Sequence, residues 1–402
     1  MRHDQRVVIT ALGLAQILGW GTSFYFPAVF SEPIVKSTGW SLGWVIAGTT
    51  IGLLVAGLIS PPVGRLISRR GGRPALLASS LCFAVGLAGI GLAPALPVYL
   101  AAWVVVGLGM GTGLYDAVFA TLGRMYGAAA RGPITNLTLF GGVASTGCWP
   151  LSAFMIDHVG WRVACLIYAG LHLAVSLPLQ MAVVRAAPAA APETEQLTVE
   201  RTADEAPIAH ERAIFVLVAV MLALAAGVGA IVVVHLLIFL QARGVDYATA
   251  VGLGTLFGPA QVVARVVERL FGGRYHPIWT MIGSCVLVAV GLALLLVQFP
   301  WLALTILLYG AGFGVSWVGR GTLPLALFGP KRFPVLMGKI AFPTLIMLAL
   351  APSLGALLIE RLGANTTIGV LTVFALVNLV LVGTLWWLCR GAPGAQAADQ
   401  EA

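Results

Sequence analysis

The sequence contains very little charge. Asp, Glu, Lys and Arg make up 9% of its 402 residues, whereas a soluble globular domain carries about 25%. Hydrophobic residues make up 59%, and such a chain cannot cover a surface that faces water. The composition therefore indicates a membrane protein. The net charge of +8 does not indicate nucleic-acid binding, because no basic cluster is interleaved with aromatic residues.

Patterns of reactive and metal-binding residues are missing as well. The five cysteines show no paired spacing and no CxxC motif, so neither a disulfide framework nor a metal site is expected. The chain has no GxxxxGK[ST] motif, which argues against ATP as its energy source. Because no Ser/His/Asp set, HExxH motif or pair of catalytic carboxylates occurs in the loops, we expect neither enzyme activity nor a cofactor.

Long apolar runs fill most of the chain. A membrane-spanning helix needs about 20 apolar residues, and the runs predict an all-α protein with twelve such helices. The expected spans are 8–30, 42–64, 74–95, 97–122, 134–155, 162–183, 214–240, 247–271, 277–298, 301–327, 335–358 and 364–389. The first run has no small-residue cleavage site, so we interpret it as a spanning helix and not as a signal peptide.

One polar segment, residues 185–212, divides the chain. It is charged and rich in Ala and Pro, which indicates a linker. The predicted domains are therefore an N-terminal six-helix half (1–184), this linker, a C-terminal six-helix half (213–390) and a tail (391–402).

The two halves look like repeats of each other. GLGMGTGLYDAVFA (107–120) matches GAGFGVSWVGRGTL (310–323) with three glycines in register. Two copies in the same orientation predict a pseudo-two-fold axis along the membrane normal and a central cavity between the halves.

Lys and Arg are distributed unevenly between the two sides of the membrane. If the N-terminus is cytoplasmic, 17 of them lie on the cytoplasmic side and four on the other. We therefore expect the N-terminus, the linker and the C-terminus in the cytoplasm. The abundance of Ala and Gly, and of Arg over Lys, favours a bacterial inner membrane.

The stretch VGRLISRRGGRP follows the second expected span. Four of its residues match the loop signature of the major facilitator superfamily: Gly64, Arg69, Gly71 and Arg73. Ser68 stands where that signature has Asp. With twelve expected spans and repeated halves, the chain resembles this superfamily over nearly its whole length. The resemblance implies a monomeric secondary transporter of a small molecule, which works by alternating access and has the proton as its expected coupling ion.

A narrower resemblance involves SFYFPAVF in the first expected span, the Trp40–Ser41 pair and QVVAR in the eighth. These stretches resemble the monocarboxylate-porter and oxalate:formate-antiporter branch. In that branch an Arg of the eighth helix pairs with the substrate carboxylate, and Arg265 occupies the matching position. Gln261 stands where monocarboxylate porters have Asp, and Ala28 where they have Lys. The resemblance implies a small organic anion as substrate.

The eighth expected span carries a polar stripe on one helix face. Its members are Gly258, Gln261, Arg265, Glu268 and Gly272. A charge at mid-bilayer costs on the order of 3 kcal/mol, so this stripe cannot face lipid. We expect Arg265, with Gln261 beside it, to line the central cavity and bind an anion. Glu268 could partner Arg265 or Arg269, or form an ion pair within the helix near its cytoplasmic end.

Other polar residues in the spans leave several possibilities open. Under the repeat alignment Arg320 lies at nearly the same depth as Asp116. The two could pair across the halves as an inner gate, Arg320 could be a second anion ligand, or each could pair within its own half. His235 could couple transport to protons or be hydrogen-bonded locally. Trp20 and Tyr25 could shape the substrate pocket or simply pack against other helices.

Two other functions also fit the sequence. A proton-driven exporter of an amphipathic or toxic compound would have a wide apolar cavity and would tolerate Arg265→Ala. The fifth expected span contains Pro150 but lacks the flanking glycines that drug:proton antiporters of the superfamily carry there. A non-transporting membrane protein of the same fold would have its cavity packed shut by side chains.

Overall fold

The computed structural model describes residues 3–186 and 210–390, and within these two ranges all regular structure is helical. The all-α prediction is confirmed there. The tail 391–402 and most of the predicted linker 185–212 lie outside the described residues. The N-terminal group of helices is α1 (His3–Gly21), α2 (Pro27–Thr38), α3 (Leu42–Arg70), α4 (Arg73–Leu92), α5 (Leu96–Gly113), α6 (Tyr115–Tyr126), η1 (Gly127–Ala130), α7 (Arg131–Leu171), η2 (His172–Ser176) and α8 (Leu177–Ala186). The C-terminal group is α10 (Glu211–Gln241), α11 (Tyr247–Gly254), α12 (Phe257–Phe271), η3 (Gly272–Arg274), α13 (Pro277–Leu296), α14 (Leu302–Leu362) and α15 (Ala364–Arg390).

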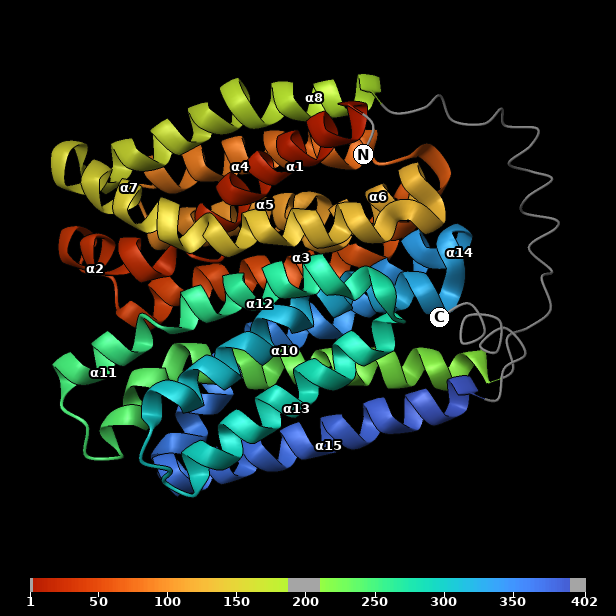
Figure 1. Ribbon diagram of the computed structural model, residues 1–402. Coiled ribbons are helices and arrows are strands. Elements are labelled where there is room, and N and C mark those ends of the chain that lie inside the picture. The colour runs from red at the N-terminus through yellow and green to blue at the C-terminus, as the bar shows by residue number, and fades with distance from the viewer. Residues whose placement is uncertain (1–2, 187–209, 391–402) are drawn as a thin grey trace, which may run out of the picture.

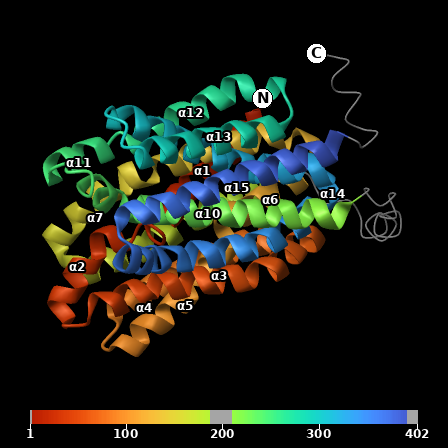
Figure 2. The same ribbon diagram turned by 90° about the horizontal axis from the view of Figure 1, so that it is seen from below.

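The helices form one elongated bundle in which the two groups lie side by side. In Figure 1 the N-terminal group, red to yellow-green, occupies the upper part, and most of the C-terminal group, green to blue, occupies the lower part. Figure 2 shows the same bundle from below, with the long helices running in roughly the same direction. The groups meet where α3, α6 and α7 pack against α12 and α14.

Eight helical stretches of the described residues are long and apolar enough to cross a membrane. Helices suit this environment because they satisfy every backbone polar group internally. Two of these stretches, Leu96–Val183 and Leu302–Leu362, have 88 and 61 residues, far more than the roughly 20 that one crossing needs. They contain kinks at Gly160 and Gly329, whose φ angles of 78° and 71° favour glycine.

The single helix expected over residues 8–30 is wrong, because a turn at residues 22–26 separates α1 from α2. The hydroxyls of Thr22 and Ser23 donate to the carbonyls of Leu18 and Gly19 at the end of α1. Such side-chain bonds compete with the helical pattern, and Pro27 opens α2 at a position where its missing N–H costs nothing.

Two further expected spans are also interrupted, and their prediction as single helices is corrected in the same way. The span 97–122 breaks at Leu114, whose extended backbone (φ −81°, ψ −173°) separates α5 from α6. The span 247–271 breaks at Thr255 and Leu256, between α11 and α12. Both breaks lie within stretches that are apolar enough overall to be expected as single spans, so average hydropathy does not signal them.

A matching contact occurs in the two groups of helices. The hydroxyl of Ser79 on α4 donates to the carbonyl of Gly109 on α5 at 2.8 Å, and that of Ser284 on α13 donates to Gly312 on α14 at 2.7 Å. The two serines are 205 residues apart and the two glycines 203. Both glycines lie in the motif that suggested a repeat, and each lets its helix approach a neighbour closely.

Candidate functional site

One end of the bundle carries most of the basic residues, and we call it the basic end and the opposite end the far end. Its basic side chains include Arg69, Arg70, Arg124, Arg131, Lys331 and Arg332. Arg124 at the end of α6 donates to the carbonyl of Ser68 at the end of α3. The loop residue that replaces Asp in the superfamily signature is therefore held through its backbone.

The two groups of helices touch at the backbone near the basic end. A Cβ atom on Gly64 of α3 would lie 2.6 Å from the carbonyl oxygen of Pro334 and 3.1 Å from the Cα of Gly338, both on α14. Glycine is required here because no side chain fits between the two helices. This contact closes the bundle on the basic side.

A buried ion pair joins the groups closer to the centre. Arg320 of α14 donates to Asp116 of α6 through Nε (2.9 Å to Oδ1) and Nη2 (2.6 Å to Oδ2). The two side chains are 5% and 12% exposed, and their two parallel hydrogen bonds form a bidentate pair, the strongest geometry for these groups. Among the arrangements that the sequence left open, the structure shows the pair across the two groups.

Three aromatic rings cover this ion pair. Trp20, Tyr115 and Trp317 contact one another with ring centroids 5.1 to 5.7 Å apart. The indole of Trp20 donates to Gln16, which in turn donates to the carbonyl of Gly113 next to the α5–α6 break. The cavity between the rings and the ion pair has a volume of about 10 Å³, which is room for about one water molecule. The centre is thus closed to a substrate in this conformation.

Arg265 of α12 is 3% exposed and also lies between the groups. Its Nε donates to the carbonyl of Gly314 at 2.9 Å, its Nη1 to that of Thr138 on α7 at 2.7 Å, and its Nη2 to the side-chain oxygen of Gln261 at 3.2 Å. Among the described residues no carboxylate lies within ion-pair distance of it. A guanidinium has five N–H donors, so two are not used by these three bonds.

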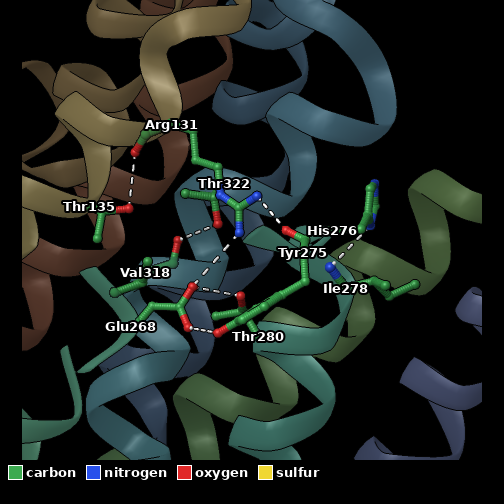
Figure 3. Close-up of polar contacts among 9 residues, drawn as sticks. All are labelled: Arg131, Thr135, Glu268, Tyr275, His276, Ile278, Thr280, Val318 and Thr322. Atoms are coloured by element: carbon green, nitrogen blue, oxygen red, sulfur yellow. Dashed lines mark hydrogen bonds and ion pairs between the residues drawn. The ribbon is translucent and has the colours of Figure 1, made fainter. Parts of the chain in front are cut away.

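Glu268 pairs with neither Arg265 nor Arg269, so its observed partners differ from every arrangement that the sequence left open. Its carboxylate accepts hydrogen bonds from Tyr275 at 2.6 Å and Thr280 at 2.8 Å, both beyond the end of α12 (Figure 3). The η3 turn brings these hydroxyls back against the helix. Arg131 of α7 lies 3.9 Å from the same carboxylate and donates to the carbonyl of Tyr275. The cluster therefore connects α12 to α7 at the basic end.

Two loop residues in this cluster keep a fixed protonation state. Burial, together with the hydrogen bond to Glu268, raises the pKa of Tyr275 to about 12, so its hydroxyl stays a donor. Burial, together with the nearby charge of Arg131, lowers the pKa of His276. Its neutral ring accepts a hydrogen bond from the backbone N–H of Ile278 at the start of α13.

Two expected site residues do not line the central cavity. His235 of α10 has its Nε2 3.0 Å from the carbonyl of Pro352 and does not line the central cavity. Tyr25, in the turn after α1, contacts Phe24 and Trp149, and Phe24 in turn contacts Trp20 of the aromatic cluster.

Sequence reasoning missed two residues of the site. Tyr115 was not singled out, although it directly precedes Asp116, and its ring forms one wall of the cavity. Thr138 contributes only its backbone carbonyl to Arg265, so its side-chain type carries no signal. Within residues 3–186 and 210–390 no group of three or more His, Cys, Asp or Glu could hold a metal.

A bundle of membrane-length helices with buried ionic groups between two packed sets has the architecture of a secondary transporter. The family model of the Major Facilitator Superfamily matches residues 12–277, and the chain belongs to this superfamily. It therefore has the general function of that fold, transport of small molecules across a membrane by alternating access. No curated protein matches the chain significantly.

Solved structures of the same fold are distant in sequence. The proton:xylose symporter XylE, bound to 6-bromo-6-deoxy-D-glucose, is similar with a TM-score of 0.68 and 14% identity, over 94% of this chain and 95% of XylE. The human organic anion transporter MFSD10 (TETRAN) is similar with a TM-score of 0.68 and 13% identity, over 94% of this chain and 99% of that protein. These matches show the fold, and they do not single out the monocarboxylate branch.

Proposed function

We propose that the chain transports a small organic anion with a carboxylate group and that Arg265 binds that carboxylate. The observation that carries this proposal is the environment of Arg265, a buried cation that donates to the carbonyl and amide oxygens of Gly314, Thr138 and Gln261 and, among the described residues, has no carboxylate within ion-pair distance. A buried charge without a counter-ion strongly favours the arrival of an anion. MFSD10 offers a precedent for organic anions on this fold.

The proposed architecture has twelve spans in two six-helix halves, 1–184 and 213–390, joined by a cytoplasmic linker. The repeated Ser79–Gly109 and Ser284–Gly312 contacts support two equivalent halves. The concentration of arginines at the basic end supports a cytoplasmic location for that end and for both termini, in a bacterial inner membrane. The functional unit is a monomer.

In this proposal, opening of the basic end makes Arg265 available. Its bond to Thr138 crosses from one half to the other, so separation of α7 from α12 breaks it. Together with the two unused N–H groups, the freed Nη1 forms a fork that matches a carboxylate. Gln261 offers an amide beside it, and Trp20, Trp317 and Tyr25 shape the pocket for the rest of the substrate.

Coupling to protons is assigned to Asp116 in this proposal. The Asp116–Arg320 pair lies between the halves beside a cavity with room for about one water molecule. Protonation of Asp116 removes its charge, weakens the pair and makes Arg320 available as a second anion ligand.

Glu268 acts in gating, since its cluster joins α12 to Arg131 of the other half. His235 can take part in coupling only indirectly, through other residues, because its hydrogen bond to the carbonyl of Pro352 stays within its own half. XylE gives a precedent for proton symport on this fold.

The two alternative functions make different predictions for this site. An exporter of amphipathic compounds needs a wide apolar cavity when its centre is open and tolerates Arg265→Ala, whereas the anion proposal requires Arg265; in the closed conformation the cavity at the ion pair measures about 10 Å³. A packed centre fits both the closed state of a transporter and a protein of this fold that does not transport. A transport measurement separates these two.

The test is uptake of a panel of labelled carboxylates into proteoliposomes, with and without an inward proton gradient. The native chain is expected to accumulate one acid when the gradient is present. Arg265→Lys keeps the charge but loses the fork, and a lost charge-assisted bond of about 1.5–3 kcal/mol should slow uptake by about ten-fold or more. Arg361→Lys, at an exposed arginine of the far end, is the matched control and should transport normally. If no acid moves, or if Arg265→Lys transports like the native chain, the anion proposal fails.

A further inference from the structure

A groove open to the membrane lies behind the helix that carries Arg265. It runs between α12, α13 and α14, has a volume of about 460 Å³ and is lined mostly by apolar side chains. Its walls include Val263, Val267 and Leu307, which are 61%, 49% and 39% exposed. In a membrane protein, surfaces of this kind contact lipid.

The stretch that contains the helix in front of this groove is the least buried of the eight membrane-length stretches. Of the apolar window in Tyr247–Arg274, which contains α11 and α12, 17% is buried, whereas the other seven membrane-length stretches have a third or more of theirs buried. In Figure 2, α12 and α13 lie next to each other along one edge of the bundle. One face of α12 holds Arg265 against α7, and the opposite face borders the groove.

The size of the groove limits what can occupy it. A volume of 460 Å³ is in the range of sites that hold one small molecule or chain. A helix from a second protein has a diameter of roughly 10 Å over a 30 Å span, which is too large for such a groove. A lipid acyl chain is long, narrow and apolar, and it matches the lining.

The basic end of the groove offers a place for a charged headgroup. Tyr275 and Trp279 border the groove there, and Trp279 packs against Trp386 with ring centroids 5.8 Å apart. Arg390 stacks on Trp386 at 3.7 Å, and Arg274 stacks on Phe271 at 5.4 Å. Among the described residues neither arginine has a carboxylate partner, so both charges are available to an anion.

The carboxylate in the floor of the groove does not oppose an anionic headgroup. Glu268 is 7% exposed, its two oxygens accept from Tyr275 and Thr280, and Arg131 lies on its other side. Figure 3 shows this carboxylate enclosed by its three partners. Its charge is therefore compensated inside the protein.

We propose that this groove binds one anionic phospholipid, with an acyl chain between α12, α13 and α14 and its phosphate at Arg274 and Arg390. Tryptophan and arginine at the mouth match the boundary between acyl chains and headgroups. The lipid comes from the leaflet at the basic end, where anionic headgroups attract basic side chains. It contacts the same helix that carries Arg265.

The test is native mass spectrometry of the full chain in detergent, titrated with phosphatidylglycerol or phosphatidylcholine. The native chain should bind one phosphatidylglycerol at least about five-fold more tightly than phosphatidylcholine, because two arginines face the headgroup. Gly283→Leu should abolish this binding event for both lipids, since Gly283 lines the groove and its missing side chain points into open space. The double variant Arg274→Gln/Arg390→Gln should remove only the preference for phosphatidylglycerol.

Matched controls use the same substitutions away from the groove. Gly252→Leu on α11 and Arg361→Gln at the far end should leave binding unchanged, because Gly252 also borders open space and Arg361 lies at the other end of the bundle. Equal affinity of the native chain for the two lipids, or native binding by Gly283→Leu, would overturn the proposal. If Gly283→Leu does not fold, as checked by thermal unfolding, the arginine variant decides. Transport plays no part in this measurement, so its result is independent of the proposed substrate.

Discussion

Asp116 and Arg320 are each costly to bury alone. Leaving one ion of a buried pair without its partner costs about 3–5 kcal/mol, whereas replacing both ions with apolar residues of similar volume is often neutral or stabilising. The pair is 12% and 5% exposed and fully bidentate. Its retention inside a membrane therefore suggests a role other than stability. The difference in stability between variants that lack one ion and a variant that lacks both can be measured.

The prediction concerns Asp116→Leu, Arg320→Met and the double variant. Each single variant should lower the thermal stability in detergent, by about 3–5 kcal/mol in the limit of a fully buried charge. The double variant should recover most of that loss, because neither ion is left unpaired. Proton-driven uptake should nevertheless be absent in all three if Asp116 couples transport. A double variant as unstable as the single ones would mean that the pair is not a closed two-ion unit, and a double variant that still transports would remove Asp116 from coupling.

At the scale of single residues, the sequence could predict that a side chain faces other helices, but not which backbone groups it bonds. The polar stripe of α12 correctly indicated that Arg265 faces other helices, because a charge cannot face lipid. Its partners could not be predicted, since the carbonyls of Gly314 and Thr138 belong to every residue type. The partners of Glu268 could not be predicted either, because Tyr275 and Thr280 follow the η3 turn, and residue spacing along a helix does not give the direction of that turn.

At the scale of elements, apolar length predicted where helices occur and failed to show where they break. The expected spans 42–64 and 277–298 correspond to α3 and α13. The breaks after α1 and at Leu114 border Gln16, Trp20 and Tyr115, so irregular backbone occurs at the polar centre. Irregular backbone is tolerated at membrane depth when protein surrounds it. The breaks thus follow from tertiary contacts that hydropathy does not contain.

The contact of α3 with α14 gives a prediction about the closed basic end. Gly338→Ala would place a Cβ against the carbonyl oxygen of Ser60 and close to the Cα of Gly64. Overpacking of this kind costs about 1–3 kcal/mol, and because this contact exists only while the basic end is closed, the open state should become more populated. We expect faster alkylation of a cysteine placed at buried Ser60, in a chain whose five native cysteines are replaced.

The control for this experiment is Gly383→Ala on α15, where an added Cβ meets open space. It should leave the alkylation rate of the Ser60→Cys chain unchanged. If Gly338→Ala also leaves the rate unchanged, the glycine contact does not govern the opening of the basic end.

For the whole molecule, the position of the contacts determines what kind of motion is possible. The links between the helix groups described above, Gly64 with Gly338, Asp116 with Arg320 and Arg265 with Thr138, lie between the basic end and the centre. They are carried by several helices of each group, so they must release together and not one at a time. Such concerted release fits two rigid halves that rock about a central site, as the family membership implies.

Rigid rocking predicts distance changes of opposite sign at the two ends. Spin labels can replace Gly132 and Gly273 at the basic end and Gly43 and Gly252 at the far end, because an added side chain meets open space at all four. In the background that carries Gly338→Ala, the distance between the basic-end labels should increase and that between the far-end labels should decrease, as measured by double electron–electron resonance. A pair within one half, Gly43 with Gly170, should keep its distance. If the basic end opens while the far end stays unchanged, the movement belongs to single helices such as α12, and the central site is not reached by alternation of the halves.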